Sequence, residues 1–354
     1  MGLLEKTIAG ISAQDEQYRE QARARLDQLT MPHWALGRLM DLAVDLAGIT
    51  RTTRPRFEKK VVVTMAGDHG VVAEGVSKFP KEVTPQMVYN FVNGGAGINA
   101  LARQAGARVV VVDMGVAADL DELATKGKVL SRKVAMGTAN MARGPAMTRE
   151  QAVQAVESGI AVVNELAGEA DLIGTGDMGI GNTTPSTAIV ACLTSTPVAE
   201  VAGRGTGLDD SQLDHKVKIV KQALEVNQPD PRDGLDVLAK VGGFEIGGIA
   251  GLILGAAALQ KPVIVDGFIS TAGALIAHAL APQVTGSIIA AHRSMEPGHK
   301  IMHNHLGCDP YLDLNMRLGE GTGAALAMNI VEAAAAVLTE VATFEEAMVS
   351  GAGE

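Results

Sequence analysis

The sequence predicts an α/β protein built on a mostly parallel sheet. Short β-branched runs alternate with longer segments of helical periodicity, and strands separated by helices are joined by right-handed crossovers. Hydrophobic residues make up 47% of the 354 residues but aromatic residues only 3%, and there are 41 glycines. This balance is typical of helices that pack closely on a buried sheet. Because the chain is longer than one hydrophobic core usually grows, we expect one large core with a smaller accessory lobe.

The expected elements follow along the chain. Helical periodicity covers residues 3–48 and a polar linker residues 50–55, which predicts a helical lobe at 1–55 before an α/β core at 56–329. A helix begins at Thr84-Pro85, and another at Thr148, where Gln151 completes a capping box. Strands are expected at 61–65, 109–112, 171–174, 263–265 and 287–290, and later helices at 209–226, 245–259 and 320–341.

Composition excludes several classes of protein. The net charge is −10 and the basic residues are scattered, which speaks against a nucleic-acid partner. Cys192 and Cys308 are two distant cysteines, which gives no disulfide framework and fits a reducing compartment. No signal peptide is visible, and the most apolar stretch, 247–259, is shorter than the ~20 residues that span a bilayer. We therefore expect a cytoplasmic protein with no membrane contact.

Polar, glycine-rich loops follow the expected strands at 66–70, 113–115, 175–179, 266–268 and 292–299. In an open parallel sheet the ligand crevice lies outside the carboxyl ends of the strands. These loops, with Asp266 among their polar residues, are therefore expected to form one site.

The glycine loop GTGDMGIGNTT at 174–184 leads from a strand into a helix that starts near Thr183. Exposed backbone N–H groups and a helix N-terminus favour an anion such as phosphate. The loop also fits Gly-x-Gly-x-x-Gly with Glu200 about twenty residues on, so a dinucleotide site or a purely structural turn remain alternatives. A second glycine cluster at 203–207 precedes a helix with Lys216, which is either a phosphate ligand or part of a solvated face.

Two further segments carry titratable side chains. The segment 292–308 contains four histidines and Cys308, but it lacks the spacing of a zinc site, and packing histidines near a substrate are favoured. Glu320 stands between two glycines before an apolar helix, either as a helix cap or as a base whose pKa is raised by apolar surroundings. Paired acids, which would hold a metal-bound diphosphate donor, are missing after the strand at 109–112.

Five segments together resemble the nicotinate-nucleotide:dimethylbenzimidazole phosphoribosyltransferases over nearly the whole chain. They are AGDHGV at 66–71, GVSKFPKEVTPQM at 75–87, the loop at 174–184, HRSMEPGH at 292–299 and LGEGTG at 318–323. The resemblance implies a Rossmann-like sheet flanked by helices. It also implies a smaller helical lobe drawn from both chain ends, including a helix at 330–354, and a homodimer without metal or other cofactor.

The resemblance also implies a reaction and its residues. Ribose 5-phosphate moves from nicotinate mononucleotide to 5,6-dimethylbenzimidazole, giving α-ribazole 5′-phosphate and nicotinate for the lower ligand of cobalamin. Glu320 is the implied general base, and Asp177, where the family often has Glu, is a secondary catalytic candidate. The implied substrate-binding residues are Ser77 and Gln86 for the base, with Gly176, Gly179, Asn182, Thr183, Gly205, Lys216 and Ser294 for the nucleotide; Asp266 is a further expected substrate-binding residue.

Two rival interpretations predict different behaviour. An NAD-dependent oxidoreductase would use the loop at 174–179 as a dinucleotide fingerprint and would bind NAD stably. A non-catalytic nucleotide-binding module would use Glu320 only as a helix cap and would show no turnover. The preferred acceptor base, the dimer interface and the pKa of Glu320 are left open by the sequence.

Overall fold

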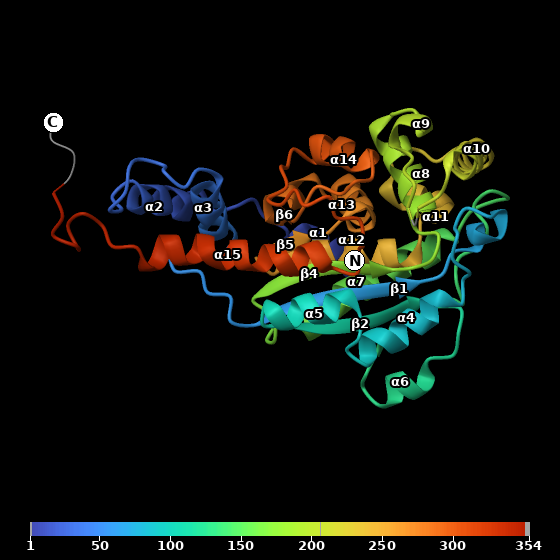
Figure 1. Cartoon of the computed structure of the whole chain (residues 1–354), viewed down its shortest axis with the longest axis horizontal. Helices are drawn as coiled ribbons and strands as arrows, with labels where there is room; N and C mark the ends of the chain where they lie inside the picture. Colours follow the sequence, from blue (N-terminus) through green and yellow to red (C-terminus); the bar gives the residue numbers. More distant parts are fainter. Residues whose placement is uncertain (1, 206, 351–354) are drawn as a thin grey trace.

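A computed structural model describes residues 2–205 and 207–350 of the chain. Its centre is an all-parallel sheet of six strands in the order β3-β2-β1-β4-β5-β6 (Figure 1). The strands are β1 (Lys60–Gly67), β2 (Ala107–Gly115), β3 (Leu130–Ser131), β4 (Leu172–Met178), β5 (Val263–Val265) and β6 (Ile288–Ala290). This is the strand order of the Rossmann fold, and it confirms the predicted fold class.

Helices cover both faces of this sheet (Figure 1). The first half of the chain contributes α1 (Leu3–Gly10), α2 (Glu16–Leu26), α3 (Arg38–Thr50), α4 (Val83–Val92), α5 (Gly97–Gln104), α6 (Asp121–Thr125) and α7 (Arg149–Glu165). The second half contributes α8 (Thr183–Thr194), α9 (Val198–Val201), α10 (Asp210–Asn227), α11 (Gly234–Val241), α12 (Phe244–Ala258), α13 (Phe268–Leu280), α14 (Gly298–Leu306) and α15 (Thr322–Glu340). Two 3₁₀ turns lie at Gly70–Glu74 and Pro282–Ser287.

Alternate residues of β1 point into two separate cores. Val61, Val63 and Met65 pack into the core shared with α7, α12 and α13, whereas Val62 and Ala66 pack into the core shared with α3, α5 and α15. Because side chains alternate along a strand, a strand covered on both faces is apolar throughout. The apolar run expected at 61–65 is therefore a central strand.

All five expected strands are present, and three of them are longer than predicted. β4 continues to Met178 because residues Lys60–Ala66 of β1 pair with Leu172–Met178 in parallel. Its last residues include Gly176 and Asp177, which have low strand propensity, so the pattern alone ended the strand at residue 174. The two-residue strand β3 was not expected.

Helix α12 is buried on all sides, as its apolar sequence predicts. A Cβ on Gly251 would lie 1.8 Å from the carbonyl oxygen of Val156, and one on Gly159 would lie 1.9 Å from that of Gly248. These glycines let the backbones of α7 and α12 come into direct contact. The high glycine content thus serves close helix packing as well as loops.

The helical lobe is formed by α2, α3 and the last turns of α15, which lie together at one end of the molecule (Figure 1). Arg25 Nε donates to the Leu338 carbonyl at 2.9 Å, and Leu29 pairs with Thr343. Helix α1 packs elsewhere, on α7 and α12. The expected helix at 330–354 ends at Glu340, and residues 351–354 lie outside the described part of the chain. The domain boundary at residue 55 stays a prediction.

Two expected helix starts have different outcomes. Thr148 and Gln151 form the predicted capping box of α7. Helix α4 instead begins at Val83, so Thr84 lies inside it, and the Thr84 hydroxyl accepts a hydrogen bond from the Ile180 N–H at 3.1 Å. Thr84 therefore ties α4 to the glycine loop rather than capping its own helix.

Within the described residues, α15 is the one helix long and apolar enough to cross a membrane. Of its most apolar stretch, 56% is buried inside the protein. It packs on β4 and β5 near its start and on α3 towards its end, which is the position of a core helix.

Candidate active site

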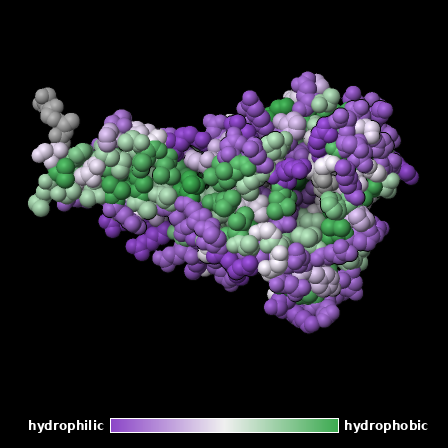
Figure 2. Space-filling model, in the orientation of Figure 1, coloured by the Kyte–Doolittle hydropathy of each residue, from purple (hydrophilic) through white to green (hydrophobic). Residues whose placement is uncertain are grey.

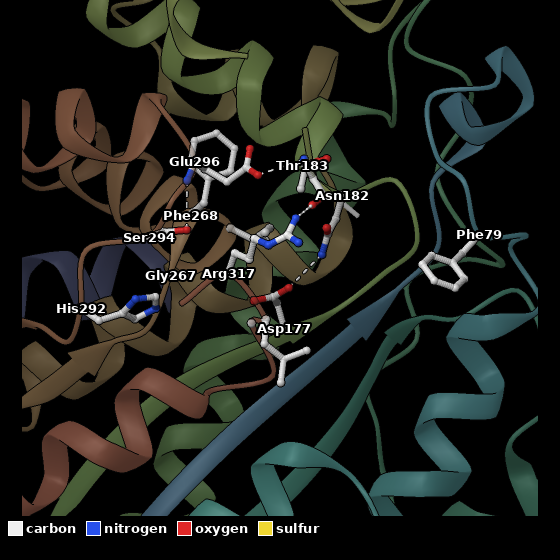
Figure 3. A pocket seen from close by; sticks show the side chains of 14 residues that line it. Phe79, Asp177, Asn182, Thr183, Gly267, Phe268, His292, Ser294, Glu296 and Arg317 are labelled. Atoms are coloured by element: carbon white, nitrogen blue, oxygen red, sulfur yellow. Dashed lines mark hydrogen bonds between the residues drawn. The ribbon is translucent and has the colours of Figure 1, made fainter. Parts of the chain in front are cut away.

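A cavity of about 420 Å³ opens at the carboxyl ends of β4, β5 and β6 (Figure 3). The loops after all five expected strands were predicted to form one site; those after β4, β5 and β6 line this cavity, whereas residues 66–70 and 113–115 do not. Its lining residues are Phe79, Asp177, Asn182, Thr183, Gly205, Gly267, Phe268, Ile269, His292, Ser294, Glu296, Arg317, Leu318 and Gly319. Asp177, Asn182, Thr183, Gly205 and Ser294 are thereby brought together as the sequence predicted.

Asp177 stands at the end of β4 with its carboxylate in the cavity wall. Its Oδ2 accepts a hydrogen bond from Asn182 Nδ2 at 2.9 Å, while its Oδ1 is buried without a partner among the described residues. Burial raises the pKa of Asp177 well above its ordinary value, and the nearby Asp266 carboxylate adds to the rise. Asp177 therefore holds a proton at pH values where an exposed aspartate is ionised.

The glycines of the loop after β4 serve backbone packing. A Cβ on Gly176 would lie 2.3 Å from the Glu320 carbonyl oxygen, and one on Gly179 would lie 2.3 Å from the Gly67 carbonyl oxygen. Gly176 lines neither the large cavity nor the small one of about 30 Å³ beside it, which Gly179 does line. The structure thus gives Gly176 a packing role where the sequence suggested contact with the nucleotide.

The dinucleotide interpretation of this loop does not fit the fold. In the Rossmann arrangement the fingerprint follows the first strand, whereas here it follows β4 and places a carboxyl group in the cavity. Glu200, offered as the ribose ligand, is exposed on α9 rather than at the end of a neighbouring strand. The loop therefore has the glycine spacing of a dinucleotide fingerprint but lacks the surrounding structure of a dinucleotide site.

Glu320 has an unfavourable backbone conformation for a residue with a side chain. Its φ is +63°, and Gly319 and Gly321 on either side have φ of +84° and +98°. Three consecutive left-handed residues explain the two glycines, but Glu320 itself carries a strain on the order of 1 kcal/mol or more. A strained residue that keeps a carboxylate is a candidate for function rather than for folding.

The Glu320 carboxylate lies against the start of α5; its neighbours Leu318 and Gly319 line the cavity, whereas Glu320 itself does not. Its Oε2 accepts a hydrogen bond from the Ile98 N–H at 3.0 Å, in the first turn of that helix. Burial raises the pKa of Glu320 above its ordinary value, against the lowering effect of the Ile98 amide, and Asp266 raises it further. The sequence suggested that Glu320 could cap the helix that follows it, α15. In the structure Glu320 instead caps α5, and it lies two residues before α15.

Asp266 is fully buried after β5 and lines neither cavity. Its Oδ1 accepts from the N–H groups of Gly323 at 2.7 Å and Ala324 at 3.0 Å, and its Oδ2 from that of Gly321 at 3.1 Å. Asp266 thus caps α15 and holds the loop that carries Glu320. Asp266 therefore positions the loop of Glu320 from within the core, and it does not make the substrate contact that the sequence suggested.

Lys216 is buried on α10, so the solvated-face alternative is wrong. Its Nζ donates to Thr183 Oγ1 at 2.8 Å and to the Gly203 carbonyl at 3.1 Å, which joins the start of α8 to the second glycine cluster. Burial lowers the pKa of Lys216 to about 8. An ammonium group beside a helix N-terminus is a suitable site for a phosphate.

The histidine-rich segment packs beside the cavity. Ser294 N–H donates to His299 Nδ1 at 2.8 Å, and His299 Nε2 lies 2.9 Å from Thr271 Oγ1, so both ring nitrogens are engaged. Burial lowers the pKa of His299 well below its ordinary value. Across residues 2–205 and 207–350, no three His, Cys, Asp or Glu side chains are grouped to hold a metal ion.

The two residues expected at the base pocket differ in position. Ser77 lines the small cavity together with Asn182 and Thr183. Gln86 is exposed on α4 and lines neither cavity, so the geometry gives its assignment no support. Phe79, from the loop before α4, faces the large cavity from the side opposite His292 (Figure 3).

Several site residues were missed from the sequence. Arg317 lies over the cavity between Asp177 and Glu296, and its Nη1 donates to the Gly205 carbonyl at 3.4 Å (Figure 3). His69 and Glu245 form a buried pair at 2.7 Å behind the glycine loop. Glu245 was visible as the one acid in an apolar helix, but its partner lies 176 residues away.

The fold and the cavity define an α/β enzyme that binds a small molecule at the carboxyl edge of a parallel sheet. The family model described as phosphoribosyltransferase matches residues 11–349. The nicotinate-nucleotide–dimethylbenzimidazole phosphoribosyltransferase of Syntrophotalea carbinolica is 64% identical over 99% of each chain, and that of Desulfotalea psychrophila 60% over 99% of each. The crystal structure of the Thermus thermophilus enzyme of this name superposes with a TM-score of 0.90 at 45% identity, covering 96% of this chain and 100% of that one.

The chain belongs to the nicotinate-nucleotide–dimethylbenzimidazole phosphoribosyltransferase family. It is an enzyme, a pentosyltransferase, and the non-catalytic binding module is thereby excluded.

Proposed function

We propose that the enzyme transfers ribose 5-phosphate from nicotinate mononucleotide to 5,6-dimethylbenzimidazole, in assembly of the cobalamin lower ligand. The proposal is supported by full-length identity to relatives that carry both substrates in their names. The observation that carries it is one cavity lined by Thr183, whose hydroxyl accepts from Lys216, and by Leu318 and Gly319, the residues directly before Glu320.

At the anion-binding end, the phosphate is held near Thr183, Lys216 and the Gly205 loop, with Arg317 above. The N-terminus of α8 adds its positive dipole end. Fixing the phosphate positions C1′ of the ribose, and such positioning supplies much of the rate acceleration. Phe79, which lines the large cavity, borders the space left for the aromatic base, and Ser77 lines the small cavity beside it.

The chemistry then requires one proton acceptor. One imidazole nitrogen of the base attacks C1′, and the bond from C1′ to the pyridinium nitrogen breaks with its electron pair going to nicotinate, which leaves as a neutral ring nitrogen. Glu320 accepts the proton that the other imidazole nitrogen loses. Attack from the face opposite nicotinate converts the β linkage to an α linkage. Asp177 is a secondary candidate that stabilises charge at the sugar, and it can do so only when ionised; burial raises its pKa against this.

The decisive experiment incubates the enzyme with nicotinate mononucleotide and a panel of azole and phenolic bases. We expect release of nicotinate and a product with the mass and α configuration of α-ribazole 5′-phosphate. Reactions without base and with Glu320→Gln are the controls. Hydride exchange with NAD, or no base-dependent release of nicotinate, would refute the proposal.

We further propose that the enzyme is a cytoplasmic homodimer. Exposed apolar side chains gather on the helical lobe, including Leu36, Met348 and Val349 (Figure 2). The cytoplasmic part of the proposal is supported by Cys192 and Cys308, which are both free. Burial raises the pKa of their thiols to about 11, so both stay uncharged at neutral pH. Sedimentation velocity tests the dimer, because a species of one chain mass at micromolar concentration would contradict it.

A further inference from the structure

Glu296 places a buried carboxylate beside the anion-binding end of the cavity. The residue is 7% exposed and lines the cavity, and its Oε1 accepts a hydrogen bond from the Gly205 N–H at 2.9 Å. Its Oε2 is buried without a hydrogen-bond partner among the described residues. A carboxylate with one unsatisfied buried oxygen is costly, which argues that it is retained for a reason other than folding.

Glu296 and Lys216 both contact the loop segment at 203–205. Lys216 Nζ donates to the Gly203 carbonyl at 3.1 Å, and a Cβ on Gly203 would lie 1.8 Å from Glu296 Oε2. The Glu296 carboxylate acts on Lys216 as an opposite charge, because it raises the lysine pKa against the larger lowering effect of burial. In this structure, therefore, the cationic group of the site already has an anionic neighbour.

We propose that Glu296 is a built-in anion that occupies part of the phosphate site and makes it selective against free inorganic phosphate. The inference rests on the proposed function, since it assumes that the nucleotide phosphate binds near Lys216. Any phosphate that enters must either replace Glu296 as the acceptor of the Gly205 N–H or bind beside the like charge of the Glu296 carboxylate. A nucleotide offsets that cost through contacts of its ribose and ring in the rest of the cavity. Inorganic phosphate has no such contacts.

The test titrates inorganic phosphate into the wild-type enzyme and into Glu296→Gln, at constant ionic strength and pH, by calorimetry. The amide can still accept from the Gly205 N–H, so the loop keeps its anchor while the charge is lost. Removal of a like charge at this range changes affinity by about tenfold or more, so we expect Glu296→Gln to bind inorganic phosphate at least that much more tightly. Equal or weaker binding would overturn the proposal.

The double variant Glu296→Gln with Lys216→Met locates the gained binding. The gain must disappear in it, because a gain that persists means that phosphate binds elsewhere and the proposal fails. A measurement on the wild type alone keeps the proposal testable if Glu296→Gln does not fold. Ribose 5-phosphate must then bind at least about tenfold more tightly than inorganic phosphate, and equal affinities would refute the selectivity.

These titrations are independent of turnover. If the wild type transfers ribose 5-phosphate to the base but Glu296→Gln binds inorganic phosphate no better, only the role of Glu296 is lost. If the wild type shows no transfer, the proposed function fails whatever the titrations give.

Discussion

Glu320 combines three properties that rarely occur together. It has a left-handed backbone, its carboxylate accepts the Ile98 N–H, and burial raises its pKa. A cap on α5 alone does not require the strained backbone, since Ser, Thr, Asp or Asn on α5 itself would serve. The proton acceptor of the proposed reaction does require a carboxylate at this point, which favours function as the reason for the strain.

We expect Glu320→Gln to fold and bind both substrates but to lose about 10²–10⁴ in single-turnover rate, the usual contribution of a general base. The amide oxygen can still accept from the Ile98 N–H, so the thermal melt should change little. Glu320→Ala is the matched comparison, because it also leaves that N–H unpaired and should lower stability by about 1–3 kcal/mol. A Glu320→Gln rate within about threefold of wild type would show that Glu320 is not the base.

The raised pKa of Glu320 predicts an acid limb in the rate of the chemical step. A general base works only when ionised, so the rate should fall about tenfold per pH unit below that pKa, and the fall should begin at a higher pH than for an exposed glutamate. Single-turnover rates measured from neutral to acid pH check this. A limb that persists unchanged in Glu320→Gln would assign it to another group, with Asp177 the first to examine.

The segment from β4 to α8 shows how one element serves two purposes. Gly176 has no side chain, and so the carbonyl of Glu320 can approach β4. Asp177 and Asn182 then face the cavity, while Thr183 starts α8 and meets Lys216. The glycine spacing that resembles a dinucleotide fingerprint therefore reflects close packing at each glycine, with Gly174 against Ala324, Gly176 against Glu320 and Gly179 against Gly67.

Gly176→Ala should lower both stability and activity. A new Cβ would lie 2.3 Å from the Glu320 carbonyl oxygen, so the strand or the loop must move. We expect a loss of about 1–3 kcal/mol in the free energy of unfolding, together with a lower kcat because Glu320 shifts. Gly168→Ala is the control, since its Cβ meets no atom within 4 Å and should change stability by less than about 0.5 kcal/mol. Denaturant melts and turnover with saturating substrates measure both effects, and wild-type behaviour of Gly176→Ala would disprove the contact.

The whole chain places its cavity at the carboxyl edge of the sheet, at the ends of β4, β5 and β6. In the order β3-β2-β1-β4-β5-β6, the strand order reverses between β1 and β4, so the cavity begins at the β4 side of this topological switch. Two acids after the strands are already paired within the fold: Asp113 forms an ion pair with Lys133 at 2.9 Å, and Asp266 caps α15. Charge at the anion site is therefore balanced by Lys216, Arg317 and a helix end.

We predict that turnover does not depend on a divalent metal. Paired acids are absent after the strand at 109–112, and Asp113 is neutralised by Lys133. Enzyme treated with a chelator and then dialysed should keep its full rate. Loss of activity that zinc or magnesium restores would contradict this prediction.

Local patterns along the chain were sufficient for the α/β class, the parallel sheet and the glutamate between two glycines. Each rests on neighbours within a few residues: alternating apolar strands, capping boxes such as Thr148 with Gln151, and glycines at positive φ. Such patterns reflect backbone sterics and burial, which act locally and can be read without a partner.

The contacts that build the site depend on the tertiary structure alone. The carboxylate of Glu320 meets Ile98 across 222 residues, Asp266 meets Gly323 across 57, and Lys216 meets Thr183 across 33. None of these pairs leaves a periodic signal, because each joins single side chains from elements that only the sheet order brings together. The burial of Lys216 and the exposure of Gln86 were decided in the same way, by which neighbouring element covers each helix face.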